Sequence, residues 1–326
     1  MTRTIGDIGE LALIERLKPF CATDAIGDDA ALLSVRPNHK LVVTTDVLVE
    51  GVHFSDRTTP PYTVGWRSVA ANLSDLAAMG AAPIGITVGL GLPSETALAW
   101  VDALYQGMAD CLGAYGGAIY GGDLCRASQR VVSITALGEV DEQRAICRDG
   151  AVAGMSVVVT GAHGASRAGL AVLLGEIEAS AHSYGWIKAH QMPAARFDVV
   201  ARLYELVGEE AVVAGMDSSD GLANALLQLS ESSGVGMDIW QSSIPLPEGL
   251  CEAVGFEKAM EWALYGGEDF ELVLCVSNAL ADELVREGVV IAIGQTTPPS
   301  DSATTQVRLL SEKNSILITH QSFQHF

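Results

Sequence analysis

Short aspartate motifs recur in this sequence beside glycine, serine and threonine. There are four: Gly27-Asp28-Asp29, Thr44-Thr45-Asp46, Gly121-Gly122-Asp123 and Asp217-Ser218-Ser219-Asp220. Each stands at a predicted strand end or turn, where glycine lets a ligand approach the backbone closely. Oxygen ligands of this kind suit Mg²⁺, which is usually held by one or two carboxylates plus phosphate and water. A single motif is most often turn chemistry, but four of them favour a site for divalent cations that offset carboxylate repulsion.

A fifth carboxylate, Asp75, lies in the string Ala71-Asn72-Leu73-Ser74-Asp75-Leu76-Ala77-Ala78-Met79-Gly80. Apolar residues at helical spacing predict a helix from near Thr63, ended by Gly80 with positive φ. The opposite stripe is small and polar: Gly65, Ser68, Asn72 and Asp75. A charge in such a crowded place needs a cation or hydrogen-bond donors. Asp75 therefore joins the candidate metal ligands, with a solvated aspartate near a helix end as the alternative.

Familiar nucleotide-binding motifs are missing from the sequence. It has no G-x-x-x-x-G-K-[ST], no G-x-G-x-x-G and no protein-kinase H-R-D or D-F-G element. With few lysines, metal ions would have to neutralise a polyphosphate, as phosphoryl transfer permits. His53 and Arg148 are candidate phosphate contacts; a solvated loop histidine and a surface arginine are the alternatives.

Composition narrows the possible classes of protein. A chain of 326 residues predicts two domains. A net charge of −21 argues against a nucleic-acid or membrane surface and leaves small anionic ligands that bind through metals. The six cysteines lack C-x-x-C spacing and no secretory segment begins the chain, so we expect reduced thiols in a cytoplasmic protein. No apolar run is long enough to cross a membrane.

Strands and helices alternate along the predicted chain, which favours α/β or α+β layers. The composition loosens at 148–154, which predicts domains 1–150 and 151–326. We expect strands at 30–33, 41–46, 84–90, 118–120, 131–140, 156–161, 211–216, 235–239, 270–276 and 289–293. We expect helices at 8–17, 63–79, 94–115, 166–174, 183–190, 194–207, 222–232 and 250–262.

Together these motifs resemble the thiamine-monophosphate kinase family, within the superfamily of aminoimidazole-ribonucleotide and selenophosphate synthetases. The resemblance runs nearly end to end. The string Asn72–Gly80 and the late string Gly266-Gly267-Glu268-Asp269-Phe270-Glu271-Leu272 are the most specific. The more widely shared matches are Gly9-Glu10, Ile26–Ala30, Thr45-Asp46, Gly51–Phe54, Gly121–Asp123 and Ser219–Leu222.

The resemblance implies ATP-dependent phosphorylation of thiamine monophosphate to thiamine diphosphate with several Mg²⁺ ions. Carried over by position, the metal ligands are Asp29, Thr44, Thr45, Asp46, Asp75, Asp123, Asp217 and Asp220. The ATP contacts are Gly122, Asp123, Arg148 and Ser219, and the thiamine monophosphate contacts are His53, Glu268 and Phe323. The implied fold is an N-terminal α/β domain for ATP, Mg²⁺ and dimerisation, whose strands build a barrel across a homodimer, followed by a C-terminal α+β domain.

The implied mechanism is direct in-line transfer of the ATP γ-phosphoryl group, with Asp46, Asp75 and Asp123 central. The carboxylates would converge on one cluster of ions that lets two anions meet. The chain departs from the family pattern at Ala153–Met155, at Ala165 and at Met192–Ala195, which affects loops rather than the acidic motifs. The alternatives are a sister ATP-dependent synthetase and a non-catalytic nucleotide or thiamine-phosphate binding protein.

Overall fold

The computed structural model describes residues 3–23, 30–207, 212–299, 306–312 and 314–319. The chain divides into two compact units, Met1–Leu76 with Ala81–Glu142, and Ala77–Gly80 with Gln143–Phe326. The change of unit thus follows Glu142. Asp29 and Phe323 lie outside the described residues.

The first unit contains a sheet of four strands in its described residues, with the order β1-β4-β2-β3. The strands are β1 (His39–Val49), β2 (Ala82–Leu92), β3 (Ala118–Arg126) and β4 (Val131–Asp141). Strands β2 and β3 are parallel, joined through helix α4 (Leu98–Tyr115), while β4 runs antiparallel to both β1 and β2. The remaining helices are α1 (Ile5–Ile8), α2 (Glu10–Leu17), η1 (Lys18–Phe20) and α3 (Pro61–Ala78).

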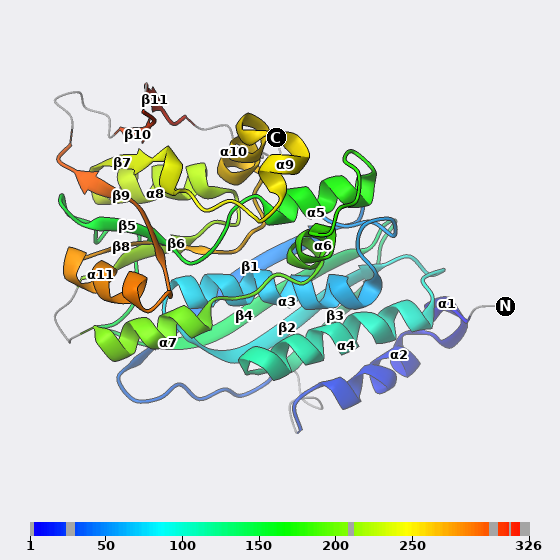
Figure 1. Cartoon of the computed structure of the whole chain (residues 1–326). Coiled ribbons are helices and arrows are strands. Elements are labelled where there is room, and N and C mark those ends of the chain that lie inside the picture. The colour runs from blue at the N-terminus through cyan, green and yellow to red at the C-terminus, as the bar shows by residue number, and fades with distance from the viewer. Residues whose placement is uncertain (1–2, 24–29, 208–211, 300–305, 313, 320–326) are drawn as a thin grey trace. The chain divides into compact units, whose positions relative to one another are not determined.

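The two faces of this sheet differ in character because strand side chains alternate sides. One face is buried and includes Ile86, Val88 and Ile134, on the side where Figure 1 draws α3 and α4. The other carries exposed apolar residues: Leu41 is 50% exposed, Val43 55% and Val47 46%. Among the described residues these strands form an open sheet, with edges β1 and β3, and do not close into a barrel.

The second unit is built on a sheet of seven strands in its described residues, ordered β11-β10-β7-β9-β5-β8-β6. The strands are β5 (Ser156–Val159), β6 (Ala214–Asp217), β7 (Gly236–Trp240), β8 (Leu272–Val276), β9 (Ile291–Thr297), β10 (Val307–Leu310) and β11 (Ser315–Leu317). The helices are α5 (Ala165–Leu174), α6 (Ser183–Gln191), α7 (Phe197–Leu206), α8 (Leu222–Ser233), η2 (Gln241–Ser243), α9 (Leu250–Val254), α10 (Phe256–Tyr265) and α11 (Asn278–Arg286).

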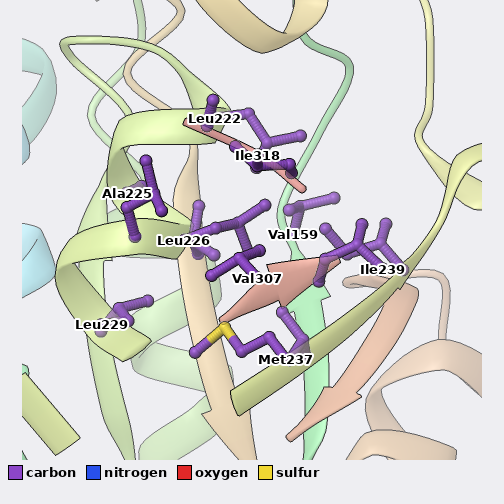
Figure 2. Close-up of a cluster of buried hydrophobic side chains, with 14 of the residues drawn as sticks. Val159, Leu222, Ala225, Leu226, Leu229, Met237, Ile239, Val307 and Ile318 are labelled. Atoms are coloured by element: carbon purple, nitrogen blue, oxygen red, sulfur yellow. The ribbon is translucent and has the colours of Figure 1, made fainter. Parts of the chain in front are cut away.

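Apolar cores lie on both sides of this second sheet. Strand β8 is buried at every position, as expected of a central strand covered on both faces. One core packs α8 against the sheet, and Figure 2 shows Leu226 of α8 beside Val307 of β10. The other core includes Leu203 of α7 and Leu284 of α11. No helix in the described part of the chain is both long and apolar enough to cross a bilayer.

Several expected elements differ from the structure. The strand expected at 30–33 is wrong: that segment has no strand pairing and Leu32 is 99% exposed. Helix α4 begins at Leu98 rather than at Ser94, because a turn in which the Thr96 N–H bonds the Pro93 carbonyl precedes it. Positive φ at Gly255 divides the helix expected at 250–262 into α9 and α10. Strands β10 and β11 were not expected.

Candidate functional site

Asp75 lies where helix α3 meets strand β1. The Thr44 hydroxyl donates to Asp75 Oδ2 at 2.5 Å. One turn earlier, Asn72 Oδ1 accepts from the Asp46 backbone N–H at 3.1 Å, and Asn72 Nδ2 donates to the Ser68 carbonyl at 3.0 Å. Buried Asn72 therefore fixes α3 to the strand and to its own preceding turn, and Asp75 is the half-buried residue of the stripe. Gly65 has a different role: a Cβ there would lie 1.9 Å from the Leu104 carbonyl oxygen of α4.

The side chains of the Thr44-Thr45-Asp46 motif lie on both faces of strand β1. Thr44 and Asp46 alternate with the exposed residues of β1 and lie on the same side as Leu48, which is buried. Thr45 lies on the open side, where its hydroxyl and that of Thr135 are 2.9 Å apart. The side chains of Thr44, Asp46 and Asp75 are thus gathered on one side, whereas the Thr45 hydroxyl is on the other.

Asp123 lies within strand β3, not at its end. Tyr120 is an extra residue in the pairing with β2, since Ile119 pairs with Ile86 and Gly121, at φ 146°, pairs with Thr87. A Cβ on Gly122 would lie 1.9 Å from the Val88 carbonyl oxygen, so only glycine fits there. This bulge sets the direction of Asp123.

The sheet register places Asp123 apart from Asp46. Asp123 pairs with Gly89, and Gly89 pairs with Ser133 on the open face. Asp46 pairs with buried Ile134 on the covered face. Strands β4 and β2 lie between them, which corresponds to about 14 Å of sheet. Within this unit, the register therefore does not bring the two carboxylates together.

His53 occupies the turn after β1. Its Nδ1 accepts a hydrogen bond from the Val49 N–H at 3.1 Å, and the ring is half-buried. A ring nitrogen that accepts from a backbone amide is unprotonated, so the other nitrogen carries the hydrogen. The side chain is therefore held in one orientation rather than freely solvated.

The second unit carries the Asp217–Asp220 motif on the loop between β6 and α8. Asp217 is buried, with 3% exposed, and the Ser219 hydroxyl donates to its Oδ1 at 3.0 Å. Asp220 is exposed and accepts from Asn224 Nδ2 at 3.4 Å. Arg148 donates to Gln228 Oε1 of α8. The motif thus combines a buried carboxylate with an exposed one.

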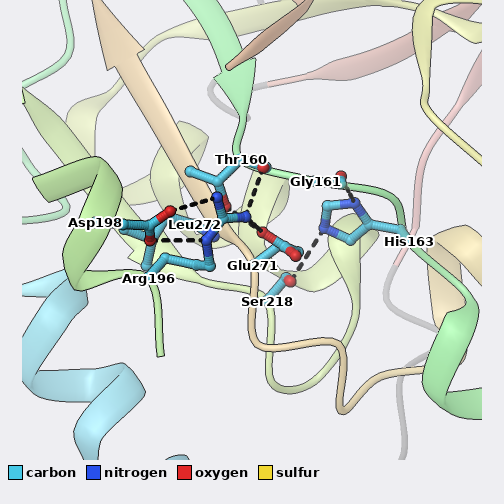
Figure 3. Close-up of polar contacts among 8 residues, drawn as sticks. All are labelled: Thr160, Gly161, His163, Arg196, Asp198, Ser218, Glu271 and Leu272. Carbon is cyan, nitrogen blue, oxygen red and sulfur yellow. Dashed lines mark hydrogen bonds and ion pairs between the residues drawn. The ribbon is translucent and has the colours of Figure 1, made fainter. Parts of the chain in front are cut away.

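A cluster of polar side chains contacts this loop through Ser218, and Figure 3 shows the contacts. His163 Nε2 lies 3.1 Å from the Ser218 hydroxyl and its Nδ1 3.1 Å from the Gly161 carbonyl. A carbonyl oxygen can only accept, so Nδ1 carries the hydrogen and donates to it. Nε2 of the neutral ring then accepts from the Ser218 hydroxyl. Burial lowers the pKa of His163 to about 4, so the ring is neutral at physiological pH.

Arg196 ties the same region to strand β8. It bonds Glu271, Asp198 and the Thr160 carbonyl, and Thr160 Oγ1 accepts from the Leu272 N–H at 2.8 Å. Burial raises the pKa of Glu271, and the charge of Arg196 opposes that rise. Arg196, which directly follows the altered segment 192–195, is therefore held in ion pairs with Asp198 and Glu271.

Glu268 lies beside the Asp217–Asp220 loop. Its backbone N–H donates to the Ser219 carbonyl at 2.6 Å, so the Gly266–Leu272 string and the Asp217–Asp220 motif are joined directly. Its side chain is 34% exposed and lies 3.8 Å from Nδ1 of buried His190. Glu268 is therefore accessible to a ligand.

Sequence reasoning missed three of these residues, His163, Arg196 and Asp269. His163 stands in none of the motifs, and Arg196 directly follows the departure from the family pattern at Met192–Ala195. Asp269 was quoted within its string, but no role followed from its position. Each has a partner 55 to 105 residues away along the chain: Ser218 for His163, Glu271 for Arg196 and Gly164 for Asp269. Only the fold reveals these contacts.

The donor set fits Mg²⁺ in kind. Within each unit the candidate side chains are carboxylates and hydroxyls, the hard oxygen ligands that this ion prefers. Among the described residues, no group of three or more His, Cys, Asp or Glu side chains is arranged to hold a metal. One or two carboxylates per ion, with phosphate and water as the other ligands, agree with this arrangement.

Known proteins share this sequence and fold. The family model of the AIR synthase related protein, N-terminal domain, matches residues 27–140. The thiamine-monophosphate kinase of Synechococcus elongatus is 46% identical over 330 residues, covering 99% of this chain and 98% of the relative.

Solved structures agree over the same length. That of thiamine-monophosphate kinase from Stenotrophomonas maltophilia matches with a TM-score of 0.79 and 32% identity, covering 92% of this chain and 96% of the other. AaThiL in complex with AMPPCP and TMP matches with a TM-score of 0.77 and 31% identity over 100% of both chains. This chain belongs to the thiamine-monophosphate kinase family.

Proposed function

We propose that this protein transfers the γ-phosphoryl group of ATP to thiamine monophosphate and so forms thiamine diphosphate. The observation that carries the proposal is the end-to-end match to a thiamine-monophosphate kinase at 46% identity. A related structure holds AMPPCP, an ATP analogue, together with TMP. The acidic motifs on β1, on β3 and on the β6–α8 loop would supply the oxygen ligands that Mg²⁺ requires.

The acceptor needs no general base. The second pKa of a phosphate monoester is near ~6, so the attacking oxygen is already anionic at neutral pH. The task of the protein is therefore to orient two anions in line and to offset their charge. When bound, Mg²⁺ would neutralise phosphate charge and stabilise the transition state.

We assign the metal ligands by unit. In the first unit, Thr44, Asp46 and Asp75 share one side of the sheet, with Thr45, Asp123 and Asp29 as further ligands. In the second unit, Asp217 and Asp220 hold metal. The Thr44 hydroxyl keeps Oδ2 of Asp75 in a fixed direction, on the side of the sheet where Thr44 and Asp46 also lie.

We assign the remaining contacts to the substrates. Gly122, Asp123, Arg148 and Ser219 contact ATP, and His53, Glu268 and Phe323 contact thiamine monophosphate. Gly122 suits an ATP contact because its bare backbone lies at a bulge. Glu268 suits a substrate contact because its side chain is about one-third exposed on a fixed backbone.

We further propose that the first unit, within domain 1–150, mediates dimerisation, with domain 151–326 completing the enzyme. The open sheet face supports this, since apolar side chains along β1 at about half exposure are unusual on a surface that stays in water. A second copy placed against that face would extend the strands into a barrel shared by two chains. Asp123, on the same face, would then lie near the partner.

Release of ADP tests the proposal directly. The purified protein is mixed with ATP and Mg²⁺, and ADP formation is measured with thiamine monophosphate, with thiamine, or with neither. We expect ADP and thiamine diphosphate only with thiamine monophosphate, and none after chelation of the metal. Turnover with a ribonucleotide instead would indicate a sister synthetase. Binding of both ligands without ADP formation would indicate a non-catalytic binding protein.

A further inference from the structure

The segment that carries Glu268 has an unusual backbone. Glu268 has φ 59° and Phe270 has φ 55°, so both occupy the left-handed region that side chains disfavour. Such a conformation is disfavoured for residues with a Cβ and persists only where the surroundings fix it. Strain of this kind concentrates at ligand-binding sites. These two strained residues flank Asp269 in the sequence.

Asp269 binds the start of a helix that is distant in sequence. Its Oδ2 accepts from the Gly164 N–H at 2.7 Å and its Oδ1 from the Ser166 N–H at 2.9 Å. Helix α5 begins there, and its own N-cap, Gly164, has no side chain to satisfy these amides. Asp269 therefore serves as a cap supplied from another segment, and both of its oxygens are engaged.

This carboxylate is partly buried beside the start of α5. Burial raises the pKa of Asp269 to about 7, and its hydrogen bonds to the backbone of α5 act in the opposite direction. Glu271, two residues on, adds a like charge. Burying a carboxylate costs free energy unless hydrogen bonds compensate, and here the amides of Gly164 and Ser166 supply them.

A second contact runs from the same helical turn to Glu268. The Ser166 hydroxyl lies 3.1 Å from Nδ1 of His190, and that nitrogen lies 3.8 Å from Glu268 Oε2. His190 is 3% exposed, whereas Glu268 is 34% exposed. The first turn of α5 thus contacts the Glu268 segment through its backbone amides and, by way of His190, through a side chain.

We propose that the first turn of α5 positions Glu268 for thiamine monophosphate, with Asp269 as the positioning residue. This inference rests on the proposed function, in which Glu268 contacts that substrate. Asp269 itself does not touch substrate; it holds the strained backbone that aims the neighbouring carboxylate. The consequence is that losing Asp269 weakens binding of thiamine monophosphate while binding of ATP is retained.

The test is a double-mutant cycle on steady-state kinetics. Wild type, Asp269→Asn, Glu268→Gln and the double variant are compared for kcat and for the KM of each substrate. We expect Asp269→Asn to raise the KM for thiamine monophosphate about tenfold and to change kcat and the KM for ATP less than about twofold. In the Glu268→Gln background the same change should add less than about twofold, because the residues act as one unit. Asp238→Asn, which breaks an ion pair with Arg308 in the same unit, is the matched control and should change neither KM.

Ser166→Ala provides an independent variant should Asp269→Asn fail to fold. It removes only the hydroxyl beside His190 and should raise the KM for thiamine monophosphate about threefold. An unchanged KM for that substrate in either folded variant overturns the proposal, as do multiplicative effects in the cycle. These results are distinct from failure of the proposed function, in which wild type itself releases no ADP with thiamine monophosphate.

Discussion

At the scale of single residues, hydrogen bonds of short side chains hold the candidate site residues in place. Thr44 and Asp75 come from different elements and meet at 2.5 Å, so each fixes the other before any ligand arrives. A buried histidine has a comparable role in the second unit, where His163 contacts the Ser218 hydroxyl in the Asp217–Asp220 loop. Positions of this kind determine where a phosphate could bind, and small substitutions there should separate activity from stability.

Asp75→Asn should abolish turnover and leave the fold intact. An amide keeps the shape of the side chain and its contact with Thr44, but it removes the charge that a cation requires. We expect kcat to fall at least about 100-fold and the unfolding midpoint to change by less than about 3 °C. Asp102→Asn, which affects only an ion pair with Arg16, is the control. Near-normal turnover by Asp75→Asn would rule out a metal role for this residue.

His163 should make stability depend on pH. Its folded pKa of about 4 is below the ordinary value of 6.5, so the unfolded chain takes up the proton first. The stabilisation is complete above pH 6.5 and is lost as the pH falls toward 4. Between about pH 7.5 and about pH 5.5 the loss should be about 1 kcal/mol.

Urea unfolding at several pH values measures this effect. The difference in free energy of unfolding between wild type and His163→Gln should shrink as the pH falls, because glutamine does not titrate. A constant difference for His163→Gln would show that His163 does not carry this effect.

At the scale of elements, close backbone approach determines which positions must be glycine. Gly65 of α3 and Gly107 of α4 each face the other helix, where a Cβ would lie 1.9 Å from a carbonyl oxygen. The two helices can therefore pack with their backbones nearly in contact. Gly122 has the same property toward β2, at the bulge that directs Asp123.

Two glycine substitutions should have opposite effects. Gly122→Ala places a Cβ against the Val88 carbonyl and should lower the free energy of unfolding by at least about 2 kcal/mol. Gly113→Ala lies in α4 with no atom within 4 Å of the added Cβ, and should raise it by about 0.5–1 kcal/mol. Chemical denaturation measures both. A tolerated Gly122→Ala would show that the bulge can relax.

At the scale of the whole molecule, one sheet face has no covering layer among the described residues. The even-numbered positions of β4 are buried, while Leu41, Val43 and Val47 on β1 project from the opposite face. A single chain leaves this apolar surface in water, and a second copy would remove it. This face supports the proposed homodimer better than composition does.

Val43→Asp should therefore weaken self-association. A charge on this face costs free energy if it is buried against a second copy. Sedimentation velocity should give a dimer for wild type and a smaller species for the variant. Val285→Asp, at an exposed apolar position on α11, should leave the dimer unchanged. A monomeric wild type would remove the dimer proposal, and a dimeric Val43→Asp would place the interface elsewhere.

The sequence by itself determined the family and the positions of most elements. Helical periodicity predicted α3, and runs of apolar residues predicted β1, β2, β4 and β8, because these signals are local. It also located the acidic motifs, since glycine, serine and threonine beside aspartate are visible without a fold.

Only the tertiary structure decided which of those residues face one another. The register places Asp46 and Asp123 on opposite faces of one sheet, and no local pattern contains a register. The split of α9 from α10 depends on the backbone conformation of Gly255, and the short strands β10 and β11 exist only through pairing. Asp269 shows the same limit: its amide partners are more than 100 residues away, and their contact arises from packing rather than from sequence.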